Sequence, residues 1–214
     1  MTTPLDHLGA VTRTIESTER DGAPARVLVV TRSYPAPPED PWAALTEPDR
    51  IARWFLPVSG DLRLGGRYQL EGNAGGTVET CDPPNAFSVT WEYDGDVTWV
   101  AVALTPDGDR TTLELRHTAH VTDERWTQFG PGAVGVGWEL ALLGLAMHLA
   151  TGVANDPAEF AAWTASEDGV AFMTGSSDGW CDAAVASGDD LAAARAAADR
   201  TIAAYTGRTL PEDA

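Results

Sequence analysis

Apolar and polar residues alternate along the middle of the chain, and turn residues separate the alternating stretches. Residues 86–93 place an apolar side chain at every second position, which is the period of a strand with one buried face. The Asp-Gly pairs at 94–95 and 107–108 mark hairpin turns after two such stretches. This pattern predicts an antiparallel meander. The predicted strands are residues 26–34, 61–64, 67–70, 76–81, 86–93, 98–105 and 111–121.

Two short helices are predicted between the first strand and the others. Residues 40–45 begin with Asp-Pro, which supplies an N-cap and a proline for the first turn. A second helix is predicted to open at Thr46, because Asp49 follows three residues later in the manner of a capping box. Pro57 ends that helix, since proline cannot continue one. The predicted order is therefore one strand, two short helices and six further strands.

A long helix over residues 130–151 follows the last strand, and it is apolar on two opposed faces. Trp138 and Leu142 belong to the stripe that we expect to lie on the sheet. Val136 and Leu143 belong to the opposite stripe, which needs a second cover. The C-terminal segment is the expected cover, and a second copy of the chain in a homodimer is the alternative.

The domain organisation follows from these elements. Residues 1–24 form an N-terminal arm or edge segment, and residues 25–153 form one domain of a sheet and a long helix. Residues 154–214 are rich in alanine and helix-capping residues, which predicts a helical extension packed on the long helix. The helices expected there include residues 169–175, residues 178–188 and a last one capped by Asp189.

Composition restricts the partners that we expect. The formal net charge is −18, and all 14 basic residues are arginine. Such an acidic surface repels phosphate, so nucleic acid and anionic membranes are not expected partners. Cys81 and Cys181 are too few and too far apart for a disulfide scaffold. With neither a signal-peptide pattern nor an apolar run of membrane-spanning length, the chain is expected to be cytoplasmic and not inserted in a membrane.

Six short motifs follow one another in the part of the chain that carries the predicted sheet and long helix. They are Trp42–Pro48 (WAALTEP) with Ile51–Phe55 (IARWF), Asp61–Tyr68 (DLRLGGRY), Gly76–Val78 with Asp82–Pro84, Val89–Trp91, Thr111–His117 (TTLELRH), and Gly137-Trp138 with Leu142 and Leu145. Together they cover about residues 26–151. In this order they resemble the activator-of-heat-shock-ATPase-like (AHSA-like) members of the START-like, or SRPBCC, superfamily. The helical tail resembles that of the longer bacterial members.

The resemblance implies an α+β helix-grip fold, in which a curved antiparallel sheet wraps around a long C-terminal helix and leaves a deep cavity. It does not imply one activity, because the superfamily includes lipid carriers, hormone receptors, polyketide cyclases and a co-chaperone. We expect the cavity to bind a small hydrophobic or amphipathic molecule, with no cofactor. A polyketide cyclase or aromatase acting on a bound ketone and a protein-partner module of the chaperone-regulator kind are the alternatives.

Large aromatic side chains are the first candidates for lining such a cavity, because their rings offer apolar area and stacking faces. Trp54 and Phe55 are expected at its mouth, where the short helices meet the sheet. His117 shares the parity of Leu113 and Leu115, so it should point inward as a polar handle or, in the cyclase alternative, as a general base. The candidate ligand-binding residues are Trp54, Phe55, Tyr68, Trp91, Trp99, Leu115, His117, Phe129, Trp138 and Leu142.

The other ionisable residues do not suggest a metal or a catalytic pair. His117 and His120 form an HxxH pattern, but an offset of three along a strand sends the two side chains to opposite faces. Glu92 and Glu114 have the parity opposite to the apolar residues of their strands, so they are expected to face solvent. We therefore assign neither a metal site nor a catalytic residue from the sequence.

Overall fold

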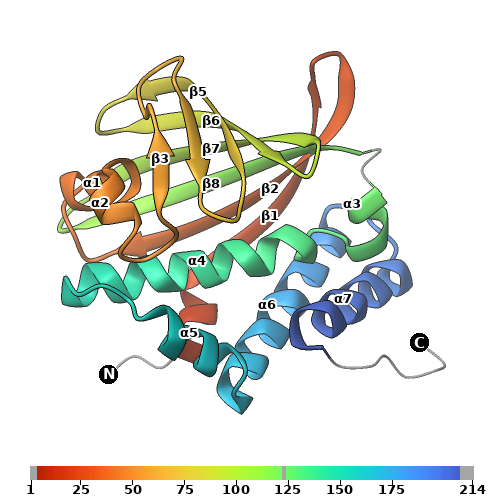
Figure 1. The fold of residues 1–214 in the computed structure, drawn as a ribbon. Helices are drawn as coiled ribbons and strands as arrows, with labels where there is room; N and C mark the ends of the chain where they lie inside the picture. Colours follow the sequence, from red (N-terminus) through yellow and green to blue (C-terminus); the bar gives the residue numbers. More distant parts are fainter. Residues whose placement is uncertain (1–3, 122–123, 208–214) are drawn as a thin grey trace. The chain divides into compact units, whose positions relative to one another are not determined.

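The computed structural model describes residues 4–121 and 124–207, which form one sheet and a set of helices (Figure 1). The strands are β1 (Val11–Arg20), β2 (Ala23–Tyr34), β3 (Val58–Gly60), β4 (Arg67–Leu70), β5 (Gly75–Asp82), β6 (Ala86–Tyr93), β7 (Asp96–Asp107) and β8 (Arg110–His120). The helices are the 3-10 helix η1 (Pro4–Ala10), α1 (Glu39–Thr46), α2 (Pro48–Ile51), α3 (Glu124–Phe129), α4 (Gly132–Thr151), α5 (Pro157–Thr164), α6 (Glu167–Ala186) and α7 (Leu191–Thr206).

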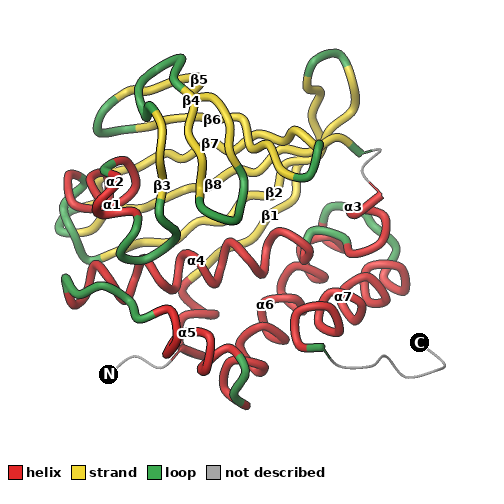
Figure 2. Tube along the Cα trace, viewed as in Figure 1, coloured by secondary structure: helices red, strands yellow, loops and turns green. Residues whose placement is uncertain are grey.

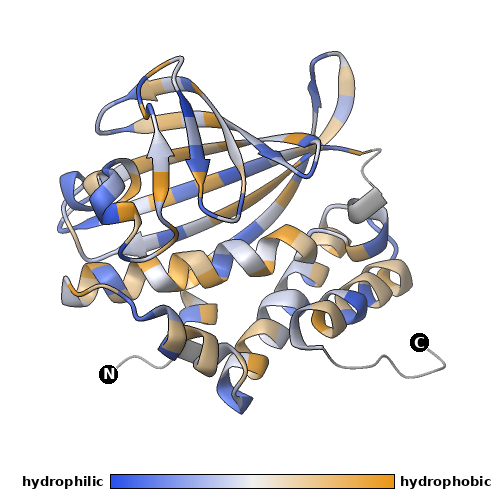
Figure 3. Ribbon diagram, in the orientation of Figure 1, coloured by the Kyte–Doolittle hydropathy of each residue, from blue (hydrophilic) through white to orange (hydrophobic). Residues whose placement is uncertain are grey.

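The eight strands make a single curved sheet in the order β1-β2-β8-β7-β6-β5-β4-β3 (Figure 2). The pairs from β3 to β8 are antiparallel, and most are joined by tight turns. A long helix, α4, follows the last strand, and it is apolar along most of its length (Figure 3). This arrangement is the helix-grip fold that the sequence predicts.

The contacts divide the chain into two compact units. The sheet unit comprises residues 31–119 and 141–155, and the helical unit comprises the described parts of residues 1–30, 120–140 and 156–214. The division runs through β2, β8 and α4, so it does not follow the sequence boundaries at 24 and 153 that we expected. Each unit is described below by itself.

In the sheet unit, strands and helices close around one buried face of the sheet. At one end of this face, Trp42 of α1 packs edge-on against Phe87 of β6, with ring centroids 6.1 Å apart. Tyr34 of β2 is 1% exposed, and its hydroxyl donates a hydrogen bond of 3.2 Å to the carbonyl of Leu142 in α4. The second half of α4 is thus tied directly to the sheet within this unit.

In the helical unit, the first half of α4 packs closely against the C-terminal helices. Gly135 lies so near the indole of Trp180 in α6 that a Cβ atom would overlap the ring. A Cβ atom at Gly132 would lie 3.2 Å from Thr201 of α7. Trp180 is fully buried. The missing side chains of these two glycines therefore let α6 and α7 approach α4.

An ion pair between β1 and α4 is buried in the helical unit. Arg13 donates from Nε and from an Nη atom to the two carboxylate oxygens of Glu139, each over 2.6 Å. The side chain of Glu139 is 1% exposed and that of Arg13 is 13% exposed. A buried carboxylate needs such a bidentate partner, because an unpaired charge away from water is costly.

The N-terminal segment was expected as an arm or edge segment, and it forms the edge strand β1 preceded by η1. Residues 1–3 of that segment lie outside the described residues. Val11 and Ile15 are buried on one face of β1, and Arg13 lies between them on the same face. Because Arg13 satisfies Glu139 there, a charged residue stands where an apolar one would have completed the alternating pattern. Arg13 interrupts the alternation of apolar residues, so the sequence pattern did not predict this strand.

Several predicted boundaries were wrong. The strand predicted at residues 61–64 is β3, three residues earlier, and the predicted N-cap of the second short helix is misplaced. The hydroxyl of Thr46 donates instead to the carbonyl of Trp42, one turn back in α1, so Glu47 occupies the N-cap position of α2. Helix α2 ends at Ile51.

The C-terminal helices also differ from the prediction. Residues 169–175 and 178–188 were expected to be two helices, but α6 runs without a break from Glu167 to Ala186. Gly175 and Gly179 lie inside it, where a Cβ atom would come within 2.6 Å of Leu8 and 3.0 Å of Arg13, respectively. These glycines allow close packing rather than a turn. The last helix is capped by Asp190, because Asp189 pairs with Arg26 at 2.7 Å.

Among the described residues, one helix has the length and composition to cross a membrane. That helix is α4, and half of the apolar stretch is buried inside the protein. A core helix of a globular fold has the same composition, so this finding is weak evidence for a membrane span.

The close approach at Gly135 yields a testable prediction. Gly135→Ala should lower the free energy of unfolding by about 1–3 kcal/mol, because the new methyl group must displace the Trp180 ring. Gly137→Ala is the matched control, since its Cβ atom would meet mainly the terminal hydroxyl of Tyr205 at 3.0 Å. Urea denaturation of both variants measures the difference. Equal stability of the two would contradict the packing described here.

Candidate functional site

The buried face of β8 defines the site. Along this strand, Leu113, Leu115 and His117 are buried, whereas the residues between them are half-buried. We call the face of the sheet unit that carries these three side chains the inner face. His117 is 5% exposed, so a polar ring is buried on the same face as Leu113 and Leu115. The inward direction predicted for His117 from its parity matches this burial.

Strand register places two more candidates relative to His117. Val100 of β7 is directly opposite His117, so Thr98 is also on the inner face. Trp91 of β6 is opposite Thr98 and therefore shares that face. Trp99 follows Thr98 in the strand and points to the other side of the sheet. The proposed grouping of Trp99 with His117 is therefore wrong, because the two side chains lie on opposite faces.

A short hydrogen-bond chain joins His117 to Trp91. The Nε2 atom of His117 lies 3.0 Å from the hydroxyl oxygen of Thr98, and that hydroxyl donates over 3.2 Å to the carbonyl of Trp91. A carbonyl can only accept, and a hydroxyl has one proton to give. Nε2 of His117 must therefore donate to Thr98. This direction fixes the neutral ring with its proton on Nε2.

Burial keeps the His117 ring neutral. Desolvation lowers the pKa of His117 from its usual value of 6.5 to about 4, because the charged form loses its hydration inside the protein. At neutral pH the ring thus serves as a hydrogen-bonding group without charge. A general base works best with a pKa near the working pH, so this shift makes His117 a weak base.

Tyr68 of β4 also lies on the inner face, and glycines make room for it. It is opposite Gly60 of β3 and Gly76 of β5, and the register carries this face through to β6. Its hydroxyl reaches past β5 and donates over 2.8 Å to the carbonyl of Thr90. Burial raises the pKa of Tyr68, so the phenol stays protonated and keeps donating.

The burial of inner-face residues changes along the sheet. Leu115, Val100 and Leu113 are at most 5% exposed, whereas Trp91 and Tyr68 are only half-buried. Thr98, which bonds the buried His117, is also half-buried. Solvent therefore reaches the group of Tyr68, Trp91 and Thr98, which we call the rim.

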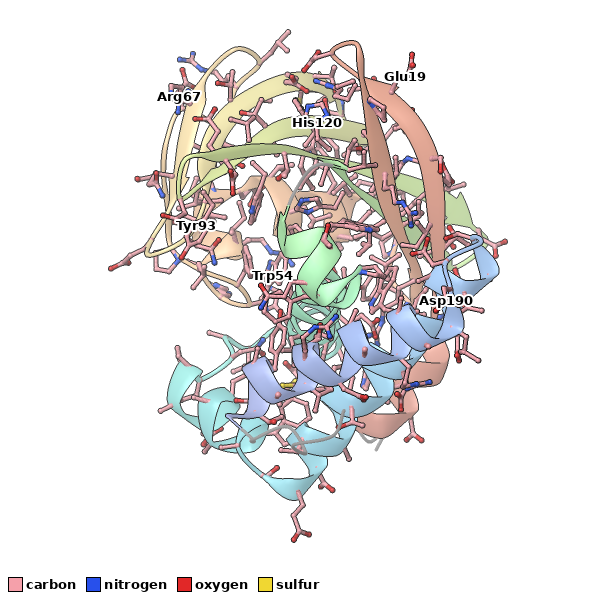
Figure 4. The ribbon with its side chains drawn as sticks, turned by 90° about the vertical axis from the view of Figure 1, so that its right-hand side faces the viewer. Glu19, Trp54, Arg67, Tyr93, His120 and Asp190 are labelled. Atoms are coloured by element: carbon pink, nitrogen blue, oxygen red, sulfur yellow. The ribbon has the colours of Figure 1, made fainter. Side chains whose placement is uncertain are left out.

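Trp54 and Phe55 follow α2 and lie beside the second half of α4. Their rings stack with centroids 5.4 Å apart, and the Trp54 indole donates over 2.8 Å to the carbonyl of Ala44 in α1. A Cβ atom at Gly144 of α4 would lie 2.8 Å from the carbonyl oxygen of Trp54. The backbone of Asn155 donates over 2.7 Å to the carbonyl of Arg53. Both rings are half-buried. The Trp54 side chain is labelled in Figure 4.

Three candidates remain. Leu142 of α4 is 2% exposed in the sheet unit, and its carbonyl accepts the Tyr34 hydroxyl. Phe129 and Trp138 belong to the helical unit, and both are half-buried. Of the ten candidates, the sheet unit contains Trp54, Phe55, Tyr68, Trp91, Trp99, Leu115, His117 and Leu142.

Three buried polar residues of the sheet unit were missed as site candidates: Arg32, Thr111 and His148. Arg32 of β2 is 6% exposed, and its guanidinium carbon lies 5.3 Å from the ring centroid of Tyr34. Its even spacing from Tyr34 could have indicated the shared face. His148 of α4 is 1% exposed, and its Nδ1 atom lies 2.9 Å from the carbonyl oxygen of Val153. Gly152, with a φ of 69°, follows the helix and makes the turn that supplies this carbonyl.

The outer side of the sheet unit carries exposed charges. Arg67 pairs with Glu92 at 2.7 Å, and their side chains are 65% and 32% exposed. Arg63 pairs with Asp61 at 2.8 Å. Figure 4 shows the Arg67 and Tyr93 side chains at the periphery of this unit. Exposed pairs of this kind contribute little to stability.

The described residues hold no group of three or more His, Cys, Asp or Glu that could bind a metal ion. In β8, His117 and His120 have opposite parity, so they do not share a ligand. The site can therefore offer a ligand hydrogen bonds, aromatic faces and apolar surface.

The sequence profile described as activator of Hsp90 ATPase homolog 1-like protein matches residues 35–150. No protein in the curated collection matches the chain.

Solved structures of similar fold exist. CalU16 from Micromonospora echinospora is 31% identical in its crystal structure, with a TM-score of 0.67, over 81% of this chain and 98% of CalU16. Its solution structure is 32% identical, with a TM-score of 0.71, over 83% of this chain and 97% of that one. MLL2253 from Mesorhizobium loti is 26% identical, with a TM-score of 0.53, over 58% of this chain and 97% of MLL2253.

The buried His117 predicts a pH dependence of stability. Its pKa is about 4 when folded and about 6.5 when unfolded, so the unfolded chain binds the extra proton between these values. The free energy of unfolding should fall as the pH drops through this window, by about 2 kcal/mol between pH 7.5 and pH 5 from this group alone.

His117→Gln removes the titrating group and keeps a hydrogen-bonding side chain. Urea denaturation at both pH values should show that the variant loses about 2 kcal/mol less than the wild type over this range. An identical loss in the two proteins would show that His117 does not titrate as a buried neutral ring.

Proposed function

This chain belongs to the family of activator of Hsp90 ATPase homolog 1-like proteins, and we propose that it binds a small amphipathic molecule on the inner face of its sheet unit. The apolar part of the ligand lies along Leu115 and Trp91. The polar part meets the rim, where Thr98 and Tyr68 carry hydroxyl groups.

One observation carries this proposal: a buried neutral histidine, on the same face as Leu115 and Val100, is linked through Thr98 to a half-exposed rim. Ligand sites in proteins combine mostly apolar walls with a few placed polar groups. A residue that served the core alone would more simply be leucine or valine, as at Leu115 and Val100 beside it. The polar chain supports recognition of a ligand that has both kinds of surface.

The same residues favour binding over catalysis. A cyclase would use His117 to remove a proton from a bound ketone, and the structure gives that ring a hydrogen-bond partner as such a role requires. With a pKa of about 4, however, the ring is a poor base at neutral pH. We therefore propose that His117 orients Thr98 rather than transferring protons.

Binding of Nile red, a neutral amphipathic dye, tests this function. The dye should bind saturably with enhanced fluorescence, and Trp91→Ala should weaken it about tenfold through loss of a stacking face. Thr98→Val keeps the shape and removes the hydroxyl, so it should weaken a ligand that bonds the rim.

Trp99→Ala is the matched control, because it removes the same side chain from the next strand but from the opposite face. This variant should bind the dye within about twofold of the wild type. Saturable binding that Trp99→Ala weakens as much as Trp91→Ala would place the dye elsewhere. Failure of the folded wild-type protein to bind Nile red would refute the proposed function.

A further inference from the structure

His148 is a second buried histidine in the sheet unit, and its hydrogen bonding is incomplete. It is 1% exposed on α4. Its Nδ1 atom lies 2.9 Å from the carbonyl oxygen of Val153, and because a carbonyl only accepts, Nδ1 carries a proton. The bond holds the ring in one orientation, since the chain returns along α4 after Gly152.

The other ring nitrogen, Nε2, lacks a hydrogen-bond partner within the described part of the chain. Among the residues that the structure describes, Nε2 of His148 has no hydrogen-bond partner, and the atom is buried. With the proton of the neutral imidazole on Nδ1, Nε2 holds a lone pair and is an acceptor. A buried acceptor left without a donor destabilises the folded protein. A donor supplied by a bound molecule would remove that cost.

His148 lies on the side of α4 that faces the chain segment after α2, which carries Trp54 and Phe55. Ala141, Leu145 and His148 follow the spacing of one helical stripe, and all three are buried in the sheet unit. Gly144 lies about 40° from His148 around the helix. A Cβ atom at Gly144 would meet the Trp54 carbonyl oxygen.

The return of the chain after α4 fixes this arrangement. The Asn155 side chain donates over 2.9 Å to the carbonyl of Gly144, and its backbone donates over 2.7 Å to the carbonyl of Arg53. Val153 lies in the same return and holds Nδ1 of His148. The acceptor is therefore held rigidly beside the segment that carries the stacked Trp54 and Phe55 rings.

We propose that Nε2 of His148 accepts a hydrogen bond from a hydroxyl or N–H group of the ligand, and that the ligand is therefore an aromatic or apolar molecule with such a donor. This assignment rests on the proposed function and narrows its ligand class. The stacked rings of Trp54 and Phe55 supply apolar contact beside the acceptor. An ether or hydrocarbon of the same shape leaves the lone pair unmet.

A matched pair of probes tests the donor requirement. 2-Naphthol and 2-methoxynaphthalene share one ring system, but only the first has a donor. Each probe competes with bound Nile red, and the ratio of the two Kd values is compared between proteins. The wild type should favour the naphthol about fivefold to tenfold more than His148→Phe does, because a buried hydrogen bond is lost in that variant.

Two further variants keep the test falsifiable. His148→Gln retains an oxygen acceptor near the position of Nε2, so it should keep most of the preference for the naphthol. His120→Phe makes the same chemical change in β8, on the face opposite to that of His117. It should leave the ratio of the two Kd values unchanged. Circular dichroism and the urea midpoint check that each variant is folded.

The outcomes separate this inference from the proposed function. Saturable Nile red binding with the same probe ratio in the wild type and His148→Phe would overturn the assignment and leave the apolar site in place. That result would mean that no ligand donor reaches Nε2 of His148. A wild type that binds no Nile red overturns both.

Discussion

The sheet unit buries one face of its sheet, and this constraint decides where each candidate side chain lies. Because side chains alternate along a strand, a shift of one residue would turn Leu113, Leu115 and His117 outward together. The register across β6, β7 and β8 then carries the same face to Trp91 and Thr98. Burial of apolar surface thus fixes the geometry of the polar groups as well.

Alternation is a local signal, and it was sufficient to predict β4 to β8 within two residues and the inward direction of His117. It could not place Trp99, because the register between strands decides which residues share a face across the sheet. It missed β1, where Arg13 interrupts the pattern to satisfy Glu139, a residue far along the chain. The bond between His148 and Val153 is local, and Gly152 makes the turn between them, but the spacing of these residues did not show that the ring is buried.

The two buried histidines of the sheet unit differ in how their ring nitrogens are hydrogen-bonded. His117 gives its proton to Thr98, which passes the chain of bonds to a backbone carbonyl. His148 gives its proton to Val153 and keeps a lone pair that no described residue meets. One ring shapes the rim through a neighbour, whereas the other presents an acceptor directly. Burial holds the His117 ring neutral, so its hydrogen-bond direction, which salt screens little, governs what it can bind.

The glycines of α4 have a consequence for the order in which the protein assembles. The helix contains four glycines, and each lowers intrinsic helix stability by roughly 1 kcal/mol relative to alanine. Those at positions 132 and 135 receive their packing partners from Thr201 and Trp180, which leave the ribosome later. The first half of α4 must therefore wait for the end of synthesis to become fixed. Chains cut short before Trp180 would expose that apolar segment to aggregation and to proteases.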